Sequence, residues 1–140
     1  MFILSILFHI VSYDIWFYIS HVALHKIRHS TIKDIHSIHH EVPYHKLKWY
    51  NVSDGHIIEH IVQPIGFLFP CLFFININGM IISSLFITIR GCMRHDDRCS
   101  WLIGTHHLLH HKYPEYNYSE YYVDYLFGTI CPIKYSSKIE

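Results

Sequence analysis

The chain has 140 residues, of which 51% are hydrophobic, and its 11 acidic residues balance its 11 basic ones. The mean hydropathy of +0.17 is high for a domain of this length and indicates contact with lipid. The balanced charge gives no sign of a surface for nucleic acid, so we expect no nucleic-acid partner. The four cysteines form no C-x-x-C pair, which argues against a zinc ribbon or a disulfide framework.

The first apolar stretch covers residues 1–20 and reads "MFILSILFHIVSYDIWFYIS". It is predicted to be a membrane span, because about 20 helical residues cross the hydrocarbon core. A signal peptide is the alternative, but the stretch lacks a basic start and a small-residue cleavage site. Asp14 lies near its end. A carboxylate is costly in lipid, so we expect this side chain to face protein.

Residues 21–60 form a segment rich in closely spaced histidines. It contains His21 and His25 in "HVALH", His36, His39 and His40 in "HSIHH", and His56 and His60 in "DGHIIEH". Residues at positions i, i+3 and i+4 share one face of a helix. Each set therefore projects its imidazoles together, as metal ligands must.

The second apolar stretch covers residues 61–89 and is predicted to be a membrane hairpin. It is too long for one span and too short for two full ones. Pro64 and Pro70 interrupt it, and the turn is expected near Asn76–Gly79. A buried hairpin in a soluble protein is the alternative.

Residues 90–140 carry a further set of histidines. "GCMRH" supplies His95, and "HLLHH" supplies His107, His110 and His111 with the same spacing as "HSIHH". A tetrahedral zinc ion needs only four ligands. The three clusters "HVALH", "HSIHH" and "HLLHH" together fit two metal ions better than one, and imidazole suits iron, zinc, copper and nickel. The isolated histidines are interpreted as hydrogen-bonded or exposed side chains: His9, His29, His45 and His106.

The basic residues are distributed on one side of the predicted membrane segments. All 11 lie within Lys26–Lys48 and Arg90–Lys138. By the positive-inside rule, both segments face the cytosol. The predicted fold is an all-α integral membrane helical bundle, a single domain over residues 1–140, with a cytosol-facing, histidine-rich helical cap.

These motifs resemble those of the fatty acid hydroxylase/sterol desaturase superfamily, which are membrane-bound, histidine-box, non-haem di-iron oxygenases. The resemblance runs from about Asp14 to Thr129. It is carried by "DIWFYISHVALH", which contains Asp14, Tyr18, His21 and His25, then by "HSIHH", "GCMRH" and "HLLHH", and finally by "YNYSEYYVDYLFGT", which supplies Asn117, Tyr118, Asp124, Phe127, Gly128 and Thr129.

The sequence departs from the family pattern in three ways. Family members are usually longer, so the chain is expected to be a minimal version or a fragment. Ser119 stands where the family often has glycine. Gly91 occupies the first position of the H-x-x-x-H expected around His95, so one ligand is missing there, and His56 or His60 could compensate.

The resemblance implies an O₂-dependent membrane oxidoreductase that hydroxylates or desaturates a lipid C–H bond, in a sterol or a fatty acyl chain, at two iron ions. The metal ligands it implies are His21, His25, His36, His39, His40, His95, His107, His110 and His111, with His56 and His60 as further candidates. Carboxylates that could orient these rings are Asp14, Asp34, Glu41, Asp54, Glu59 and Asp124.

The same resemblance implies electrons from NAD(P)H, delivered by a cytochrome b5-type or reductase partner, because the sequence contains no G-x-G-x-x-G motif. The expected location is an endoplasmic reticulum-like membrane. The alternative function is a catalytically inactive metal- or lipid-binding membrane protein of the same fold. Metal transport is disfavoured, because most of the histidines lie outside the apolar stretches.

Overall fold

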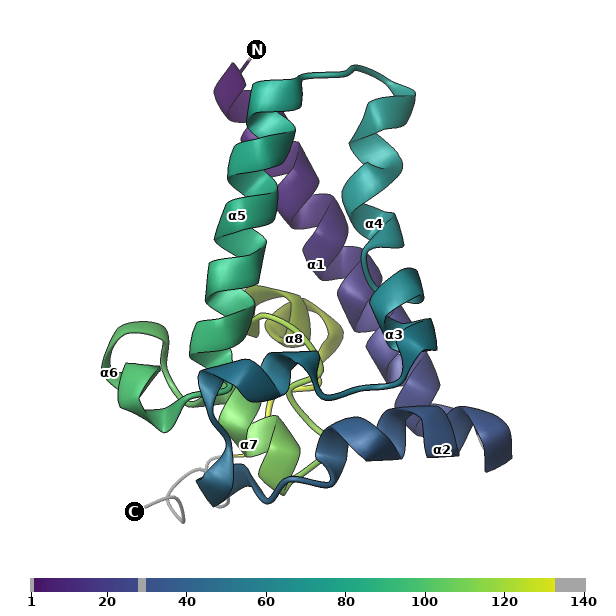
Figure 1. The fold of residues 1–140 in the computed structure, drawn as a ribbon, viewed down its shortest axis with the longest axis vertical. Coiled ribbons are helices and arrows are strands. Elements are labelled where there is room, and N and C mark those ends of the chain that lie inside the picture. The colour runs from purple at the N-terminus through teal and green to yellow at the C-terminus, as the bar shows by residue number, and fades with distance from the viewer. Residues whose placement is uncertain (1, 28–29, 133–140) are drawn as a thin grey trace.

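The computed structural model describes residues 2–27 and 30–132, and within these ranges the chain is helical and contains no strand (Figure 1). The longest helix, α1 (Phe2–Lys26), packs against both α4 (Ile65–Leu68) and α5 (Ile77–Arg94). The remaining elements are α2 (Ser30–Ser37), η1 (Ile38–His40), η2 (Tyr44–Lys46), η3 (Trp49–Ser53), α3 (Ile57–Val62), η4 (Phe69–Leu72), η5 (Asp97–Cys99), α6 (Ser100–Ile103), α7 (His106–Lys112) and α8 (Tyr121–Phe127).

By length and composition, α1 is the one helix among the described residues that could cross a membrane. It covers nearly all of the predicted span and continues to Lys26. The second apolar stretch forms two arms, the short helices of Ile57–Leu72 and the long helix α5, joined near the N-terminal end of α1 (Figure 1). These elements agree with a helical membrane protein.

The turn between the two arms lies slightly earlier in the chain than the sequence predicts. Asn76 was expected to open the turn, but its side chain instead accepts a hydrogen bond from the backbone N–H of Gly79 at 2.9 Å and caps α5. An asparagine at this position satisfies one of the free N–H groups at a helix start. The helix therefore begins at Ile77, inside the expected turn, and runs on to Arg94.

Small residues allow α4 and α5 to approach α1 closely. The Ser83 hydroxyl on α5 donates to the carbonyl of Ile6 on α1 at 3.3 Å. On the other side, Gly66 of α4 lies directly against Trp16 of α1, whose ring nitrogen donates to the carbonyl of Val62 at 2.8 Å. Helix pairs of this kind depend on side chains that leave room for the neighbouring backbone.

Replacing Gly66 with alanine will therefore destabilise the protein. A Cβ atom at this position would lie 2.1 Å from the Cβ of Trp16, and helix α4 would have to move away from α1. Overpacking of this kind costs about 1–3 kcal/mol, which thermal unfolding in detergent will measure. The matched control is Gly55→Ala, whose Cβ would meet its nearest neighbour, His60, at an ordinary 3.7 Å. Equal unfolding temperatures for the two variants would contradict the prediction.

The carboxylate of Asp14 faces protein, as expected for a charged group in an apolar helix. Its side chain is 1% exposed, and it accepts hydrogen bonds from Arg90 at 3.0 Å and from the hydroxyl of Tyr122 at 2.8 Å. Ser119, which departs from the usual family glycine, donates its hydroxyl to the backbone carbonyl of Asp14 at 2.9 Å. These contacts connect α1 to α5 and to the C-terminal part of the chain.

Candidate metal centre

Four segments bring nine histidines together at the end of the molecule opposite the hairpin turn (Figure 1). The last turns of α1 supply His21 and His25, and α2 with η1 supplies His36, His39 and His40. His95 caps the C-terminus of α5, and α7 supplies His107, His110 and His111. All nine firm candidates from the sequence are therefore neighbours.

The nine side chains form two groups. Group 1 consists of His21, His25, His36, His40 and His110, and group 2 consists of His39, His95, His107 and His111. Within each group, one ring nitrogen from every residue lies within 4.8 Å of the others. The groups adjoin, since the ring centroids of His40 and His111 are 4.7 Å apart.

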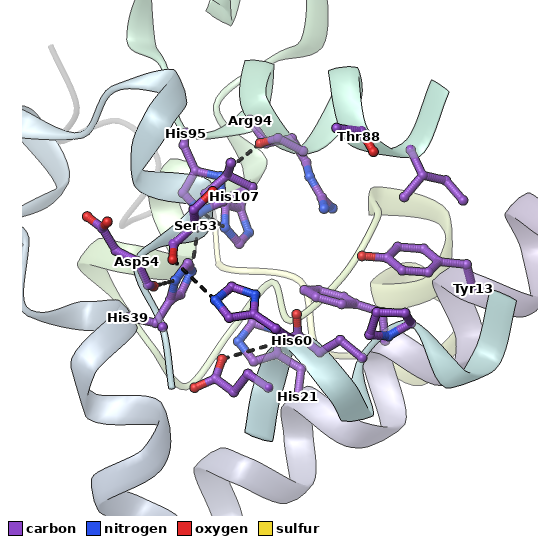
Figure 2. Close-up of a pocket in the computed structure, with 18 of the residues that line it drawn as sticks. Tyr13, His21, His39, Ser53, Asp54, His60, Thr88, Arg94, His95 and His107 are labelled. Carbon is purple, nitrogen blue, oxygen red and sulfur yellow. Dashed lines mark hydrogen bonds between the residues drawn. The ribbon is translucent and has the colours of Figure 1, made fainter. Parts of the chain in front are cut away.

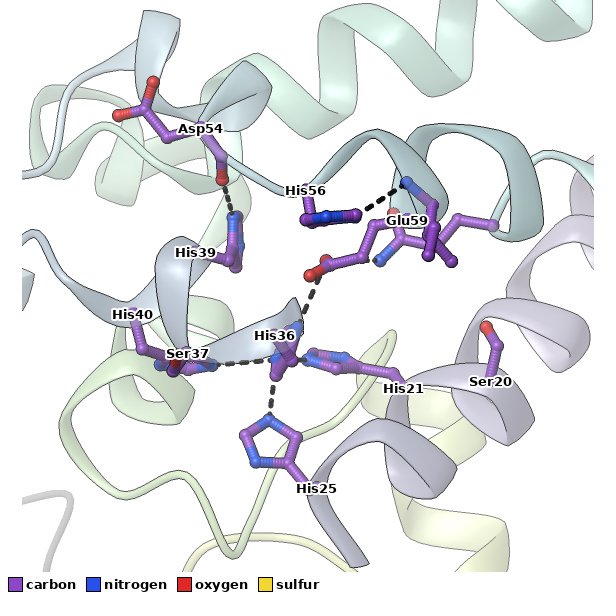
Figure 3. Close-up of polar contacts among 12 residues, drawn as sticks. Ser20, His21, His25, His36, Ser37, His39, His40, Asp54, His56 and Glu59 are labelled. Carbon is purple, nitrogen blue, oxygen red and sulfur yellow. Dashed lines mark hydrogen bonds and ion pairs between the residues drawn. The ribbon is translucent and has the colours of Figure 1, made fainter. Parts of the chain in front are cut away.

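In group 1, the Nε2 atoms point toward a common centre (Figure 3). The Nε2 of His36 lies 3.0 Å from that of His21, 2.9 Å from that of His25 and 3.0 Å from that of His40. The Nε2 of His110 lies 3.1 Å from that of His25. One imidazole nitrogen has a single proton or a single lone pair. Hydrogen bonding alone cannot satisfy three neighbours around the His36 nitrogen.

Hydrogen bonds of the Nδ1 atoms determine the tautomers of two rings in group 1. Nδ1 of His21 lies 2.5 Å from the carbonyl oxygen of Tyr118, and Nδ1 of His110 lies 2.7 Å from that of Tyr116. A carbonyl oxygen only accepts, so Nδ1 must carry the proton in both rings. In the neutral rings, each Nε2 therefore presents a lone pair to the centre of the group.

Group 2 has the same construction. Nδ1 of His39 donates to the backbone carbonyl of Asp54 at 2.6 Å, and Nδ1 of His95 donates to that of Gly91 at 2.8 Å. The two Nε2 atoms then face each other at 3.2 Å, and the Nε2 of His107 lies 3.2 Å from that of His95. Gly91 thus contributes a backbone carbonyl at the position where the family pattern has a further histidine.

Burial favours the neutral form of His95 and His40. It lowers the pKa of His95 to about 3, with a further contribution from the nearby His39. Burial likewise lowers the pKa of His40 to about 2, and the adjacent His36 and His39 act in the same direction. Neutral imidazoles are the form that binds metal. Without a cation, however, lone pairs facing each other at about 3 Å repel.

Metal ions fit both groups. Imidazole nitrogens bind a metal such as zinc at about 2.0–2.1 Å, so two of them at right angles around one ion are about 2.9 Å apart. The Nε2 separations of 2.9 to 3.1 Å in group 1 match this spacing. In group 2, the Nδ1 of His107 and both ring nitrogens of His111 are buried and, within the described part of the chain, have no hydrogen-bond partner. A bound cation would supply a partner for the ring nitrogens that face it.

The two further candidates lie outside both groups. Nδ1 of His56 accepts a hydrogen bond from the backbone N–H of Ile58 at 3.2 Å and caps α3. Nε2 of His60 donates to the carbonyl of Ser53 at 3.2 Å. Neither His56 nor His60 therefore takes the place of the ligand that is missing at Gly91 in these two groups.

The isolated histidines are placed individually. His9 donates to the carbonyl of Phe67 at 2.7 Å, His106 pairs with Asp124 at 2.9 Å, and the side chain of His45 is exposed. These placements agree with the interpretation of the three as hydrogen-bonded or exposed side chains. His29 lies outside the described residues.

Of the six candidate orienting carboxylates, only Glu59 uses its side chain on one of the nine histidines (Figure 3). Its Oε2 accepts from Nδ1 of His36 at 3.1 Å, and Glu59 itself is 3% exposed. Asp54 contributes its backbone instead, while its carboxylate accepts from Asn51 at 2.5 Å. The other four carboxylates are directed elsewhere: Asp14 pairs with Arg90, Asp124 pairs with His106, and Asp34 and Glu41 are exposed.

Replacing Glu59 with leucine will weaken metal retention by group 1. The substitution removes the acceptor that fixes the proton and the orientation of the His36 ring. Loss of such a partner typically lowers metal affinity about 10- to 100-fold. Competition with a chelator will measure the change, and Glu41→Leu, at an exposed position, is the control. Equal chelator resistance in both variants would show that Glu59 does not orient the ring.

The motif "YNYSEYYVDYLFGT" builds the loop that holds two histidines of group 1, His21 and His110. Asn117 has a left-handed backbone with φ of 57°, and its side chain donates to the carbonyl of His106 at 3.0 Å. The carboxylate of Asp124 accepts from the N–H of Tyr118 at 2.9 Å and from the hydroxyl of Thr129 at 2.6 Å. The motif residues thus position the carbonyl groups of the loop at residues 116–118.

Sequence reasoning missed these backbone acceptors. The carbonyls of Tyr116, Tyr118, Asp54 and Gly91 orient four of the nine rings. Every residue has a carbonyl, so no residue type marks the ones that do this. The conspicuous "YNYS" turn was the one local signal that pointed to the first two.

A cavity of about 340 Å³ adjoins both groups (Figure 2). His21 and His36 of group 1 line it, together with His39, His95 and His107 of group 2. Its other walls combine apolar and hydroxyl-bearing residues, Tyr13, Phe17, Pro64, Phe67, Ser84, Ile87 and Thr88 among them, with the polar residues Asp54, Glu59, His60, Gln63 and Arg94. A small apolar molecule in this cavity would lie beside both sets of imidazoles.

A family model described as fatty acid hydroxylase matches residues 6–129, which include all nine grouped histidines. No curated protein and no solved structure gives a significant match to the chain.

Proposed function

Because the chain belongs to the fatty acid hydroxylase family, we propose that it is an O₂-dependent oxidoreductase that hydroxylates or desaturates a lipid C–H bond at two histidine-bound iron ions. The observation that carries this proposal is the pair of adjoining groups of imidazoles whose ring nitrogens converge. Iron is among the metals that imidazole suits.

A redox metal is needed because an unactivated C–H bond has no acidic proton that a side chain could remove. When bound, iron would supply the oxidising power that protein side chains lack. His21, His25, His36, His40 and His110 would hold one ion, and His39, His95, His107 and His111 the other. The carboxylate of Glu59 and the backbone carbonyls would hold the Nδ1 protons and keep the rings oriented.

A lipid is the substrate class that the cavity favours. Phe17, Phe67 and Ile87 present apolar surface next to the histidines. The long apolar helix α1 and the family both indicate a membrane protein, so a lipid could reach the cavity without crossing water. Either a sterol or a fatty acyl chain is compatible with the family.

Electrons would come from NAD(P)H through a separate cytochrome b5-type or reductase partner, since these 140 residues contain no dinucleotide-binding motif. The one-sided distribution of basic residues supports a cytosolic orientation of the histidine groups. An endoplasmic reticulum-like membrane, where lipid and reductants meet, suits both requirements.

Lipid analysis of cells that express the chain will test this function. We expect a hydroxylated or newly unsaturated sterol or acyl chain, which disappears when His39 is replaced by alanine. The variant is the matched control because it removes one ring from group 2 and leaves the apolar helices unchanged. If the two lipid profiles were identical and the purified chain contained no iron, the proposal would be wrong.

A further inference from the structure

The two histidine groups differ in their number of donors. Group 1 contains five histidines, and group 2 contains four. Near the end of α5, Gly91 lies one helical turn before His95, and residues four apart share a helix face. Glycine supplies no donor at this position. A metal ion in group 2 therefore has fewer protein ligands than one in group 1.

The space beside Gly91 belongs to the cavity. Gly91 lines the cavity, and among the described residues outside its own helix a Cβ atom at this position would meet only Val52, at 3.3 Å. Three of the four histidines of group 2 also line the cavity, compared with two of the five in group 1. The group with fewer donors is therefore the one that faces the cavity more fully.

Arg94 places a positive charge on the wall of the same cavity (Figure 2). It is 8% exposed, and it is the only lysine or arginine among the described residues that line the cavity. Its charge acts on group 2, because it adds to the effect of burial in lowering the pKa of both His95 and His107. A negatively charged ligand beside these two rings would be attracted to it.

The guanidinium of Arg94 is only partly occupied by the protein. One N–H group donates to Oε1 of Glu120 at 2.5 Å, and the same oxygen lies 3.1 Å from Nε of Arg90. The Nε of Arg94 is buried and has no hydrogen-bond partner in the described part of the chain. Arg94 thus shares its one carboxylate with another arginine and retains N–H groups for a further acceptor.

We propose that group 2 and Arg94 together form a binding position for a small anionic ligand that reaches it through the cavity. The inference rests on the metal centre of the proposed function. Four imidazoles leave room for a further donor on a bound ion, and open positions of this kind are typical of non-haem iron sites. The guanidinium supplies charge-assisted hydrogen bonds to the same ligand. Small anions should therefore bind at group 2 and not at group 1.

Azide titration of the cobalt-loaded full chain will test this position. Imidazole sites accept cobalt(II), whose visible absorption changes with its ligands. The variant His110→Ala lacks a donor of group 1 and reports on group 2, whereas His39→Ala lacks a donor of group 2 and reports on group 1. We expect saturable azide binding to the wild-type chain and to His110→Ala only. Azide binding to His39→Ala, or to none of the three proteins, would overturn the proposal.

Two substitutions test the contributions of Arg94 and Gly91. Arg94→Gln should weaken azide binding about 10-fold or more while cobalt is retained, because a hydrogen bond between charged groups is lost. Gly91→His fills the space beside group 2, should weaken azide binding as well, and serves if Arg94→Gln fails to fold. Arg98→Gln is the matched control, since the side chain of Arg98 is 66% exposed and does not line the cavity. Unchanged azide affinity in either variant that retains cobalt would refute the site.

The azide titration is independent of the proposed oxidation, because it requires neither lipid nor an electron donor. A chain that takes up no cobalt would refute the metal centre and this binding position together. Lipid oxidation without azide binding would refute only the binding position. Azide binding without lipid oxidation would refute only the proposed function.

Discussion

Replacing His110 with alanine is expected to abolish lipid oxidation and to remove the ion of group 1 while the ion of group 2 is retained. His110 is fully buried, its Nε2 lies 3.1 Å from that of His25, and its Nδ1 is anchored on Tyr116. Alanine offers no nitrogen at this position. Metal analysis of the purified variant, together with product analysis, will measure both effects.

Replacing His39 with alanine should also abolish lipid oxidation, but it should remove the ion of group 2 instead. It removes a ligand of group 2, whose Nε2 lies 3.2 Å from that of His95, and should leave the group 1 ion bound. The matched controls are His45→Ala, at an exposed position, and His60→Ala, which lines the cavity but belongs to neither group. Full turnover in the His39 or His110 variant would rule out the assignment of two ions to these two groups.

Replacing Asp124 with asparagine is the second change with a large expected effect. The fully buried carboxylate accepts four hydrogen bonds, two on each oxygen. Oδ1 accepts from Tyr118 and Thr129, and Oδ2 accepts from Ser119 and His106. An asparagine has only one oxygen, so two of these donors would face an amide N–H₂. The expected loss of stability is about 2–4 kcal/mol, which thermal unfolding in detergent will measure.

The Asp124→Asn variant should also weaken metal binding by group 1. The N–H of Tyr118 bonds to Asp124, and the carbonyl of Tyr118 accepts from Nδ1 of His21, so a shifted loop would release this ring. Iron content should fall together with the unfolding temperature. Asp97→Asn is the control, because the side chain of Asp97 is 61% exposed. Unchanged iron content and stability in the Asp124 variant would contradict the structural role of this carboxylate.

The spacing in the sequence singled out the three clusters "HVALH", "HSIHH" and "HLLHH", and the family resemblance added His95. Spacings of three and four residues determine a shared helix face, and three such sets in one short chain are hard to explain without a metal. The expectation that Asp14 faces protein also followed from the sequence, because a carboxylate in an apolar helix needs a partner.

Only the tertiary structure decided how the histidines divide between the two groups. "HSIHH" sends His36 and His40 to group 1 and His39 to group 2, and "HLLHH" sends His110 to group 1 but His107 and His111 to group 2. Residues on one helix face are equivalent in the sequence pattern. Which group a histidine of these clusters joins depends on its neighbours in the fold. Group 1 forms around the histidines at the end of α1, and group 2 forms around His95 at the end of α5.

The ring orientations were likewise beyond the sequence. Four of them depend on backbone carbonyls, which no residue type identifies, and the fifth depends on Glu59, which was one of six equivalent candidates. The position of His56 and His60 outside both groups was also decided by packing, because their spacing is as suitable as that of His21 and His25. Local periodicity therefore determined the donors, and the long-range contacts between α1, α5 and the C-terminal loop determined the geometry in which they face a metal.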